Sequence, residues 1–293
     1  MSITDDELEI ESSRAPLLDH QTELRSRLIA CMFALVAGFI LCFLFSKEIY
    51  IFLLQPFAHA ADLMAAQKAG HAKGVDLFLA VIGLKPVAHG VAPALHLVYT
   101  EPLEFFFTKV KLAGFGAIVL AFPVLAFQLY GFVAPGLYKR ERRAFLPFLT
   151  AAPVLFLLGA ALVYFIMLPF VLWFSLSQQI VGTGSIDVQL LPKVSDYLTL
   201  VTSLLLAFGL CFQLPVVLSL LGMAGIVTTH MLTAVRRYAI VGVFIVAAVL
   251  TPPDPFSMMS LALPGVLLYE VSILCVWLIE RRRRREEEAA EAA

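Results

Sequence analysis

Charged residues are scarce in this sequence. Only 15% of the 293 residues are charged, 60% are hydrophobic, and the mean hydropathy is +0.90. So little charge cannot give a water-soluble fold of this size a polar surface, and such a composition is typical of a membrane protein. The net charge of −1 also provides no basic surplus for binding nucleic acid. We therefore predict a polytopic protein that lies in the lipid bilayer and has no nucleic-acid partner.

The sequence lacks the common catalytic and cofactor motifs. It contains no GxxxxGK[ST] loop for nucleotides, no HExxH pair for zinc and no GxSxG nucleophile turn. The glycine-rich segment GTGSID, beginning at Gly182, has no strand or helix signal around it and is interpreted as a loop. We predict that the chain is not an enzyme and uses no cofactor.

The candidate metal ligands are poorly spaced. Four histidines in the segment 47–109 are separated by 12, 18 and 7 residues, which gives no i, i+4 pair on a helix. They are His59, His71, His89 and His96. Four cysteines lie in apolar runs without CxxC spacing and are interpreted as buried small hydrophobic residues. They are Cys31, Cys42, Cys211 and Cys275. No metal site is expected.

Six apolar runs are long enough to predict transmembrane helices. They cover residues 28–45, 112–133, 146–173, 198–221, 238–250 and 258–279. The fifth run is short, so it either lies in a thinned patch of bilayer or ends part-way across. The sequence therefore predicts an all-α integral membrane protein that forms a single polytopic domain over residues 1–293.

The distribution of lysine and arginine predicts the orientation of these helices. If the N-terminus is cytoplasmic, fourteen Lys and Arg residues lie on the cytoplasmic side and seven on the other, and every arginine lies among the fourteen. The first 26 residues are too acidic for the basic start of a signal peptide, so no cleaved segment is expected. We expect cytoplasmic tails at 1–26 and 280–293, and a long external segment at 47–109 that forms a partly helical cap.

Prolines occur in or beside several of the predicted spans. Each removes a backbone hydrogen bond and bends its helix. Either these bends are merely structural, or together they produce a concave wall that faces lipid and receives another component; the sequence leaves both possibilities open. The prolines are Pro123, Pro147, Pro153, Pro169, Pro215 and Pro264.

Two polar residues stand within the apolar runs, where burial of a charge costs about 2.5–3.5 kcal/mol. Glu270 is expected either to stay protonated or to pair within the bundle. Gln213 has two interpretations: its amide satisfies the carbonyl that Pro215 frees, or it faces the concave lipid side and receives a polar group from a partner helix. We expect the second arrangement.

Two carboxylates, Glu23 and Glu141, each precede a predicted span at the cytoplasmic surface. Taken singly, each has an ordinary structural role, such as an i, i+4 pair of Glu23 with Arg27. Together they fit a ligand with two adjacent arginines. Neighbouring side chains of an extended peptide point in opposite directions, and each guanidinium binds a carboxylate through a two-pronged contact, so two separated acceptors suit it best.

Several motifs resemble, in order, those of the TatC family, the core subunit of the twin-arginine protein translocase. They are HQTELRSRL, EPLEFFFTKVKL, APGLYKRERRAFLPF, FGLCFQLPVV, RRYAIV and LTPPDPFS, and the resemblance runs from about His20 to Glu280. It implies a receptor in the bacterial inner membrane for signal peptides with paired arginines. It also implies an oligomer that works with the single-span subunits TatA and TatB to export folded proteins on the proton-motive force.

The resemblance also implies roles for individual residues. Glu23 and Glu141 would bind the arginine pair, with Lys139 and Arg143 holding the loop and Phe132 near the binding surface. Pro56 and Asp254 occupy matching external positions and are given structural roles.

The chain departs from the family pattern in two places. Its external segment is longer, chiefly at residues 58–93, and Gln213 stands where many relatives have glutamate, which argues against an obligatory proton-carrying role there. A small-solute secondary transporter is the alternative function, although its expected inverted repeats are not found. An intramembrane protease is disfavoured by the missing motifs.

Overall fold

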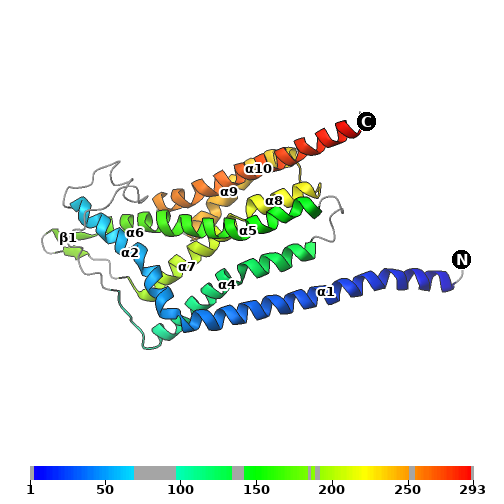
Figure 1. Ribbon diagram of the computed structural model, residues 1–293. Coiled ribbons are helices and arrows are strands. Elements are labelled where there is room, and N and C mark those ends of the chain that lie inside the picture. Colours follow the sequence, from blue (N-terminus) through cyan, green and yellow to red (C-terminus); the bar gives the residue numbers. More distant parts are fainter. Residues whose placement is uncertain are drawn as a thin grey trace.

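The computed structural model is a bundle of long helices (Figure 1). It describes residues 3–68, 97–133, 142–183, 186–188, 192–250 and 255–291. Within these ranges, six helical stretches are long and apolar enough to cross a membrane, which confirms the prediction of six spans. They are Thr22–Leu44, Glu104–Leu129, Thr150–Ser177, Val194–Met223, Thr229–Val249 and Leu261–Arg285.

The helices follow one another along the chain with few other elements. They are α1 (Ile3–Leu44), α2 (Ser46–Lys68), α4 (Glu104–Val133), α5 (Arg142–Leu162), the π-helical turn η2 (Val163–Met167), α6 (Leu168–Ser177), α7 (Val194–Cys211), α8 (Leu214–Met223), α9 (Thr229–Leu250) and α10 (Pro255–Glu291). Two short strands, β1 (Ile180–Thr183) and β2 (Ile186–Val188), pair antiparallel between α6 and α7. The interpretation of GTGSID as a loop without strands is therefore wrong. The strands are too short to give a recognisable alternating pattern.

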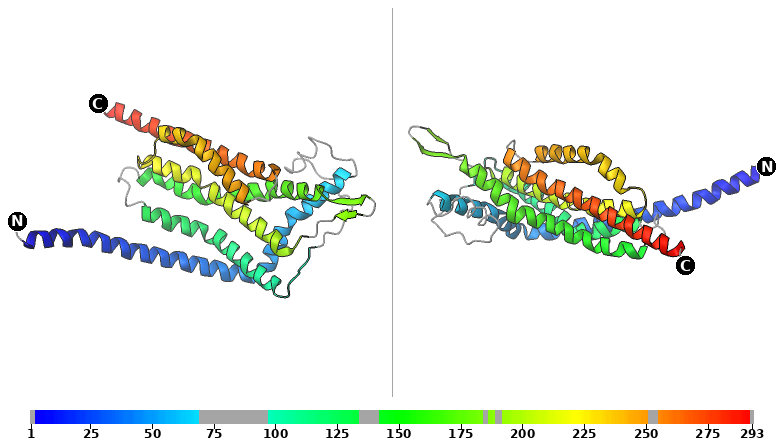
Figure 2. Two further views of the ribbon diagram at one scale, coloured as in Figure 1. Left: turned by 180° about the vertical axis from the view of Figure 1, so that it is seen from behind. Right: turned by 90° about the horizontal axis from the view of Figure 1, so that it is seen from above.

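The two termini lie at the same end of the bundle. Figure 2 shows this end together with the end of α4, the start of α5 and the α8–α9 connection, whereas α2 and the hairpin lie at the opposite end. We call these the terminal end and the cap end. As far as the structure describes them, the segments that charge counting assigned to one side of the membrane thus lie at one end of the bundle.

Small residues allow α1 to lie directly against α4. A Cβ atom on Gly38 would come within 3.2 Å of the Ala117 backbone, and one on Gly116 would come within 2.5 Å of the Cys42 Sγ atom. Close backbone approach through small residues is a common way for membrane helices to associate, because lipid provides no hydrophobic drive between them. This contact fixes the position of α1 along the axis of α4.

Helices α5 and α7 are joined by two reciprocal contacts between a phenyl ring and a glycine. A Cβ atom on Gly209 of α7 would lie 2.5 Å from the Phe156 ring of α5, and one on Gly159 of α5 would lie 2.7 Å from the Phe212 ring. Phe156, Gly159 and Gly209 are buried. Each ring therefore occupies the space that a side chain on the opposite helix would need.

Both of the long middle spans are interrupted just before a proline. The third changes to the π-helical turn η2 before Pro169, and the fourth has a turn at Phe212 and Gln213 before Pro215. Proline has no N–H group to continue the ladder of backbone hydrogen bonds, so it favours such breaks. The second break turns Gln213 towards α5.

The predicted external cap is helical over Ser46–Lys68, which is α2. Pro56 is fully buried inside this helix and leaves the Phe52 carbonyl without its usual helical donor. The Tyr164 hydroxyl donates to that carbonyl at 2.7 Å, and the Tyr197 hydroxyl donates to the Leu53 carbonyl at 2.7 Å. Two tyrosines of the bundle therefore hold the proline turn of the cap.

A buried carboxylate joins the beginnings of α4 and α7. Glu104 accepts hydrogen bonds from the backbone N–H groups of Thr100, Glu101 and Ser195 at 2.8–3.3 Å. Just before the two helices, Val98 and Lys193 form a parallel bridge. Since the first N–H groups of a helix have no partner within it, one side chain here satisfies donors at two helix starts.

The fifth span is longer than its sequence indicates. Helix α9 begins at Thr229, so Arg236 lies within it, and the prediction of a short span beginning at residue 238 is wrong. Arg236 forms an ion pair with Glu270 of α10, and its Nε atom donates to the carboxylate at 2.6 Å. At the terminal end, Glu280 accepts hydrogen bonds from the N–H and hydroxyl groups of Thr229 at 2.9 and 2.8 Å. Both contacts join α9 to α10.

Candidate functional site

Glu23 lies on α1 near the terminal end of the bundle and pairs with Arg27 one helical turn further along. The Arg27 Nη2 atom donates to Glu23 Oε1 at 2.6 Å, and the Nε atom donates to the same oxygen at 3.2 Å. The Glu23 side chain is 39% exposed and the Arg27 side chain 24% exposed. The carboxylate is therefore held in place but remains accessible from outside.

Arg27 also attaches this ion pair to α4. Its Nη1 atom donates to the Gln128 carbonyl at 3.4 Å, and a Cβ atom on Gly131 would collide with the same nitrogen. A side chain at position 131 would therefore displace the guanidinium from the place it occupies. The consequence is that Glu23 sits beside the last turns of α4, although Arg27 and Gln128 are 101 residues apart in the sequence.

The other residues of the predicted site belong to the same end of the molecule. Phe132 is the penultimate residue of α4, and Arg143 is the second residue of α5. Lys139 and Glu141 lie outside the described residues, in the chain segment that joins these helices. The structure thus places Glu23 beside the helix that carries Phe132 and leads into the segment with Glu141.

The contact of Arg27 with α4 is not predicted from the sequence. The sequence indicates Arg27 only as an i, i+4 partner of Glu23, because spacing along one helix reveals nothing about a neighbouring helix. Gly131, a glycine at the end of an apolar span, is the one available signal. Glycine is frequent in membrane helices, so its presence does not by itself indicate a bound arginine.

Gln213 does not face a lipid-exposed concavity, so that expectation is wrong. Its side chain is 9% exposed and its Nε2 atom donates to the Ala152 carbonyl of α5 at 3.0 Å. A second, longer contact of 3.5 Å reaches the Gly209 carbonyl. Neither carbonyl is that of Cys211, which Pro215 frees. The break between α7 and α8 turns the amide inward, where a carbonyl of α5 accepts its proton.

The Oε1 atom of Gln213 is buried and has no hydrogen-bond partner among the described residues. Gln213→Leu would therefore remove one satisfied donor and one unsatisfied acceptor together. Hydrogen bonds between membrane helices average about 0.6 kcal/mol, so we expect the free energy of unfolding to change by less than about 1 kcal/mol. Thermal unfolding in detergent would measure the change, with the exposed Gln178→Leu as control. A loss well above about 2 kcal/mol would contradict this account of the amide.

The remaining predicted residues divide between the described and undescribed parts. Of the two states considered for Glu270, the structure shows the ion-paired one, with Arg236. Asp254 lies outside the described residues, as do His71, His89 and His96. Among the residues that are described, no cluster of three or more potential ligands could hold a metal ion.

These features define a class of protein: a six-span helical membrane protein with a helical cap at one end and an accessible carboxylate at the other. The family model for the Sec-independent protein translocase protein (TatC) matches residues 19–264. The chain belongs to the TatC family.

Curated relatives match over nearly the whole chain. The Sec-independent protein translocase protein TatC of Magnetococcus marinus is 40% identical over 285 residues, which are 97% of this chain and 92% of the relative. Those of Rickettsia prowazekii and Escherichia coli K12 are 34% and 32% identical, over 89% and 88% of this chain and 92% and 86% of the relatives.

Two solved structures have the same fold. A crystal structure of the twin-arginine translocase receptor TatC has a TM-score of 0.67 at 31% identity, covering 89% of this chain and 99% of that chain. A second, in the detergent DDM, has a TM-score of 0.68 at 32% identity, covering 87% and 98%. These relatives are translocase proteins, and none of those named supports the alternative of a small-solute transporter.

Proposed function

We propose that this protein is the signal-peptide receptor and core component of a twin-arginine translocase. The observation that carries the proposal is the position of Glu23, held by Arg27 against the end of α4 that leads to the segment bearing Glu141. Membership of the TatC family supports it, since similar solved structures are described as twin-arginine translocase receptors.

The proposed chemistry is recognition of two neighbouring guanidinium groups by two carboxylates. Glu23 would take one arginine and Glu141 the other, because adjacent arginines of an extended peptide diverge and cannot share one acceptor easily. Arg27 donates twice to one oxygen of Glu23, so it pre-orients the carboxylate. Lys139 and Arg143 would hold the connecting segment, and Phe132 would contribute apolar surface.

The proposal includes an orientation and partners. The terminal end would face the cytoplasm, since all thirteen arginines belong to segments assigned to that side, and the membrane would be the bacterial inner membrane. TatA- and TatB-like single-span subunits and further copies of this chain would complete the translocase, driven by the proton-motive force. Docking of a partner helix at Gln213 would require α5 to move away from the amide, because Ala152 now occupies that side.

Binding of an arginine-pair signal peptide tests the proposal. We expect Glu23→Gln and Glu141→Gln each to weaken binding by at most about 1.5–3 kcal/mol, the contribution of a hydrogen bond to a charged group. Exposure and salt reduce the effect. Photocrosslinking of the peptide to purified full-length protein in nanodiscs would measure it.

Two controls make the experiment specific. Glu48→Gln removes an exposed carboxylate at the cap end and should leave binding unchanged. A peptide with two lysines in place of the arginines should bind the unmodified protein more weakly, since lysine lacks the planar two-pronged donor. Equal binding by all three carboxylate variants and the unmodified protein would refute the assigned site.

A further inference from the structure

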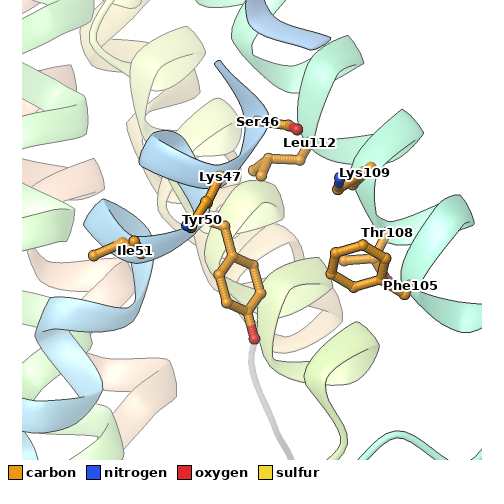
Figure 3. Close-up of a pocket in the computed structure, with 8 residues that line it drawn as sticks. All are labelled: Ser46, Lys47, Tyr50, Ile51, Phe105, Thr108, Lys109 and Leu112. Carbon is orange, nitrogen blue, oxygen red and sulfur yellow. The ribbon is translucent and has the colours of Figure 1, made fainter. Parts of the chain in front are cut away.

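A pocket of about 300 Å³ lies between α2 and α4 at the cap end of the bundle, far from the proposed peptide site. Figure 3 shows Lys47, Tyr50 and Ile51 of α2 on one side and Phe105 and Lys109 of α4 on the other. The buried side chains of Ser46, Thr108 and Leu112 complete its lining. The lining is almost entirely apolar, and Lys47 and Lys109 contribute to it mainly through the carbon stems of their side chains.

The pocket lies at the edge of the hydrocarbon region. The first span ends at Leu44, three residues before Lys47, and the second begins at Glu104, five residues before Lys109. At 1.5 Å per residue, the backbone of Lys109 lies less than about 10 Å inside the apolar span. Its long side chain can cover that distance and bring the ammonium group to the level of the lipid headgroups. Exposed Tyr99 packs edge-on against Phe105, as aromatic residues commonly do at this depth.

Among the described residues, no carboxylate pairs with either lysine of the pocket. Lys109 lies 4.6 Å above the Phe105 ring. The nearby carboxylate of Glu104 is engaged with the N–H groups of helix starts instead. Burial raises the pKa of the Tyr50 phenol, so it stays protonated and adds a hydroxyl group to the wall. The pocket is thus apolar within, and the ammonium group of Lys109 lies beside its Phe105 wall.

We propose that this pocket binds one anionic phospholipid of the leaflet at the cap end, with the phosphate between Lys47 and Lys109 and an acyl chain along Ile51 and Leu112. A soluble anion would not need the apolar wall. A partner helix about 10 Å across would not enter a cavity of this volume. A phospholipid has both the negative headgroup and the slender apolar chain that the lining accommodates.

Native mass spectrometry of the purified full-length protein in detergent tests this proposal with two lipids, phosphatidylglycerol and phosphatidylcholine. Both lipids carry a phosphate, but the choline cation of phosphatidylcholine offsets its charge. We therefore expect phosphatidylglycerol to be retained at least about tenfold better, since each lysine near a net negative headgroup favours it about fivefold. Lys47→Gln with Lys109→Gln should abolish this preference. Lys111→Gln, an exposed lysine on α4 outside the pocket lining, should preserve it.

A variant of the apolar wall separates the pocket from general surface attraction. Ile51→Trp fills part of the lining without changing charge, and should lower retention of phosphatidylglycerol several-fold while the melting temperature without lipid is unchanged. Excess inorganic phosphate should not displace the bound lipid. The proposal is overturned if both lipids are retained equally, if Lys111→Gln reduces retention as much as the pocket variants, or if a photocrosslinker at Ile51 captures a protein helix and no lipid.

Discussion

Gly159→Ala combined with Gly209→Ala is expected to separate α5 from α7. Although the two substitutions add only two methyl groups, we expect a large decrease in the free energy of unfolding. Each new Cβ atom would lie within 2.5–2.7 Å of a phenyl ring on the opposite helix, closer than such atoms approach in real structures. The Phe156 ring is buried and stacks on Phe122 at 4.0 Å, so it has no free space to enter. Overpacking of this kind costs about 1–3 kcal/mol per site.

Thermal unfolding in detergent would measure this loss, and Gly242→Ala supplies the control. A Cβ atom on Gly242 meets nothing within 4 Å, and alanine is the better helix former by about 1 kcal/mol, so that variant should unfold at the same or a slightly higher temperature. Phe156→Leu should partly restore the stability of Gly209→Ala by removing the ring it strikes. If the double alanine variant is as stable as the unmodified protein, the two glycines are not required for the α5–α7 contact.

Tyr197→Phe is expected to loosen the cap from the bundle. The substitution keeps the ring, which packs against Phe57 at 5.3 Å, and removes only the hydroxyl that donates to the Leu53 carbonyl. Tyr197 is buried, so the carbonyl would lose its tyrosine donor without gaining water, at a cost of about 0.5–1.5 kcal/mol for the lost hydrogen bond. Tyr164→Phe should have a similar effect at the Phe52 carbonyl, which Pro56 deprives of its helical donor.

Hydrogen exchange along α2, together with thermal unfolding, would detect this change. Amides of Ser46–Lys68 should exchange faster in Tyr197→Phe, whereas those of α9 should be unaffected. Tyr238→Phe removes a hydroxyl from an exposed tyrosine and serves as the matched control. Equal protection of α2 in Tyr197→Phe and Tyr238→Phe would show that the hydroxyl does not hold the cap.

The six spans could be predicted from the sequence because each must be apolar over the thickness of a bilayer, which is a local property. The start of α9 could not be predicted in this way. Arg236 and Arg237 indicate a boundary just before the apolar run, yet Arg236 is neutralised by Glu270, 34 residues further along. A scan of hydropathy treats each charge alone, so it misplaces a helix whose charge is paired across the bundle.

The candidate site was predictable in its residue types but not in its arrangement. Glu23 was identified by its position before a span, since a carboxylate next to an apolar run is a local feature of the sequence. Its attachment to α4 depends on Gly131 and a backbone carbonyl, which have no side-chain signature. The direction of the Gln213 side chain was predicted wrongly for a related reason. It depends on how the chain turns at Phe212 before Pro215. A proline indicates that a helix breaks, but it does not indicate which way the preceding side chain points.

The carboxylate of Glu104 has a consequence for the order in which the chain assembles. Its acceptor oxygens serve the start of α4, but one of its donors, Ser195, is 91 residues later in the sequence. During synthesis the second span therefore enters the bilayer before the donor from the fourth exists. The two helices can reach their final register only after Ser195 has been synthesised and has reached the cap end. Docking of α7 beside α4 is therefore a late step of biogenesis. It also depends on a contact between residues far apart in the sequence, and such contacts slow folding.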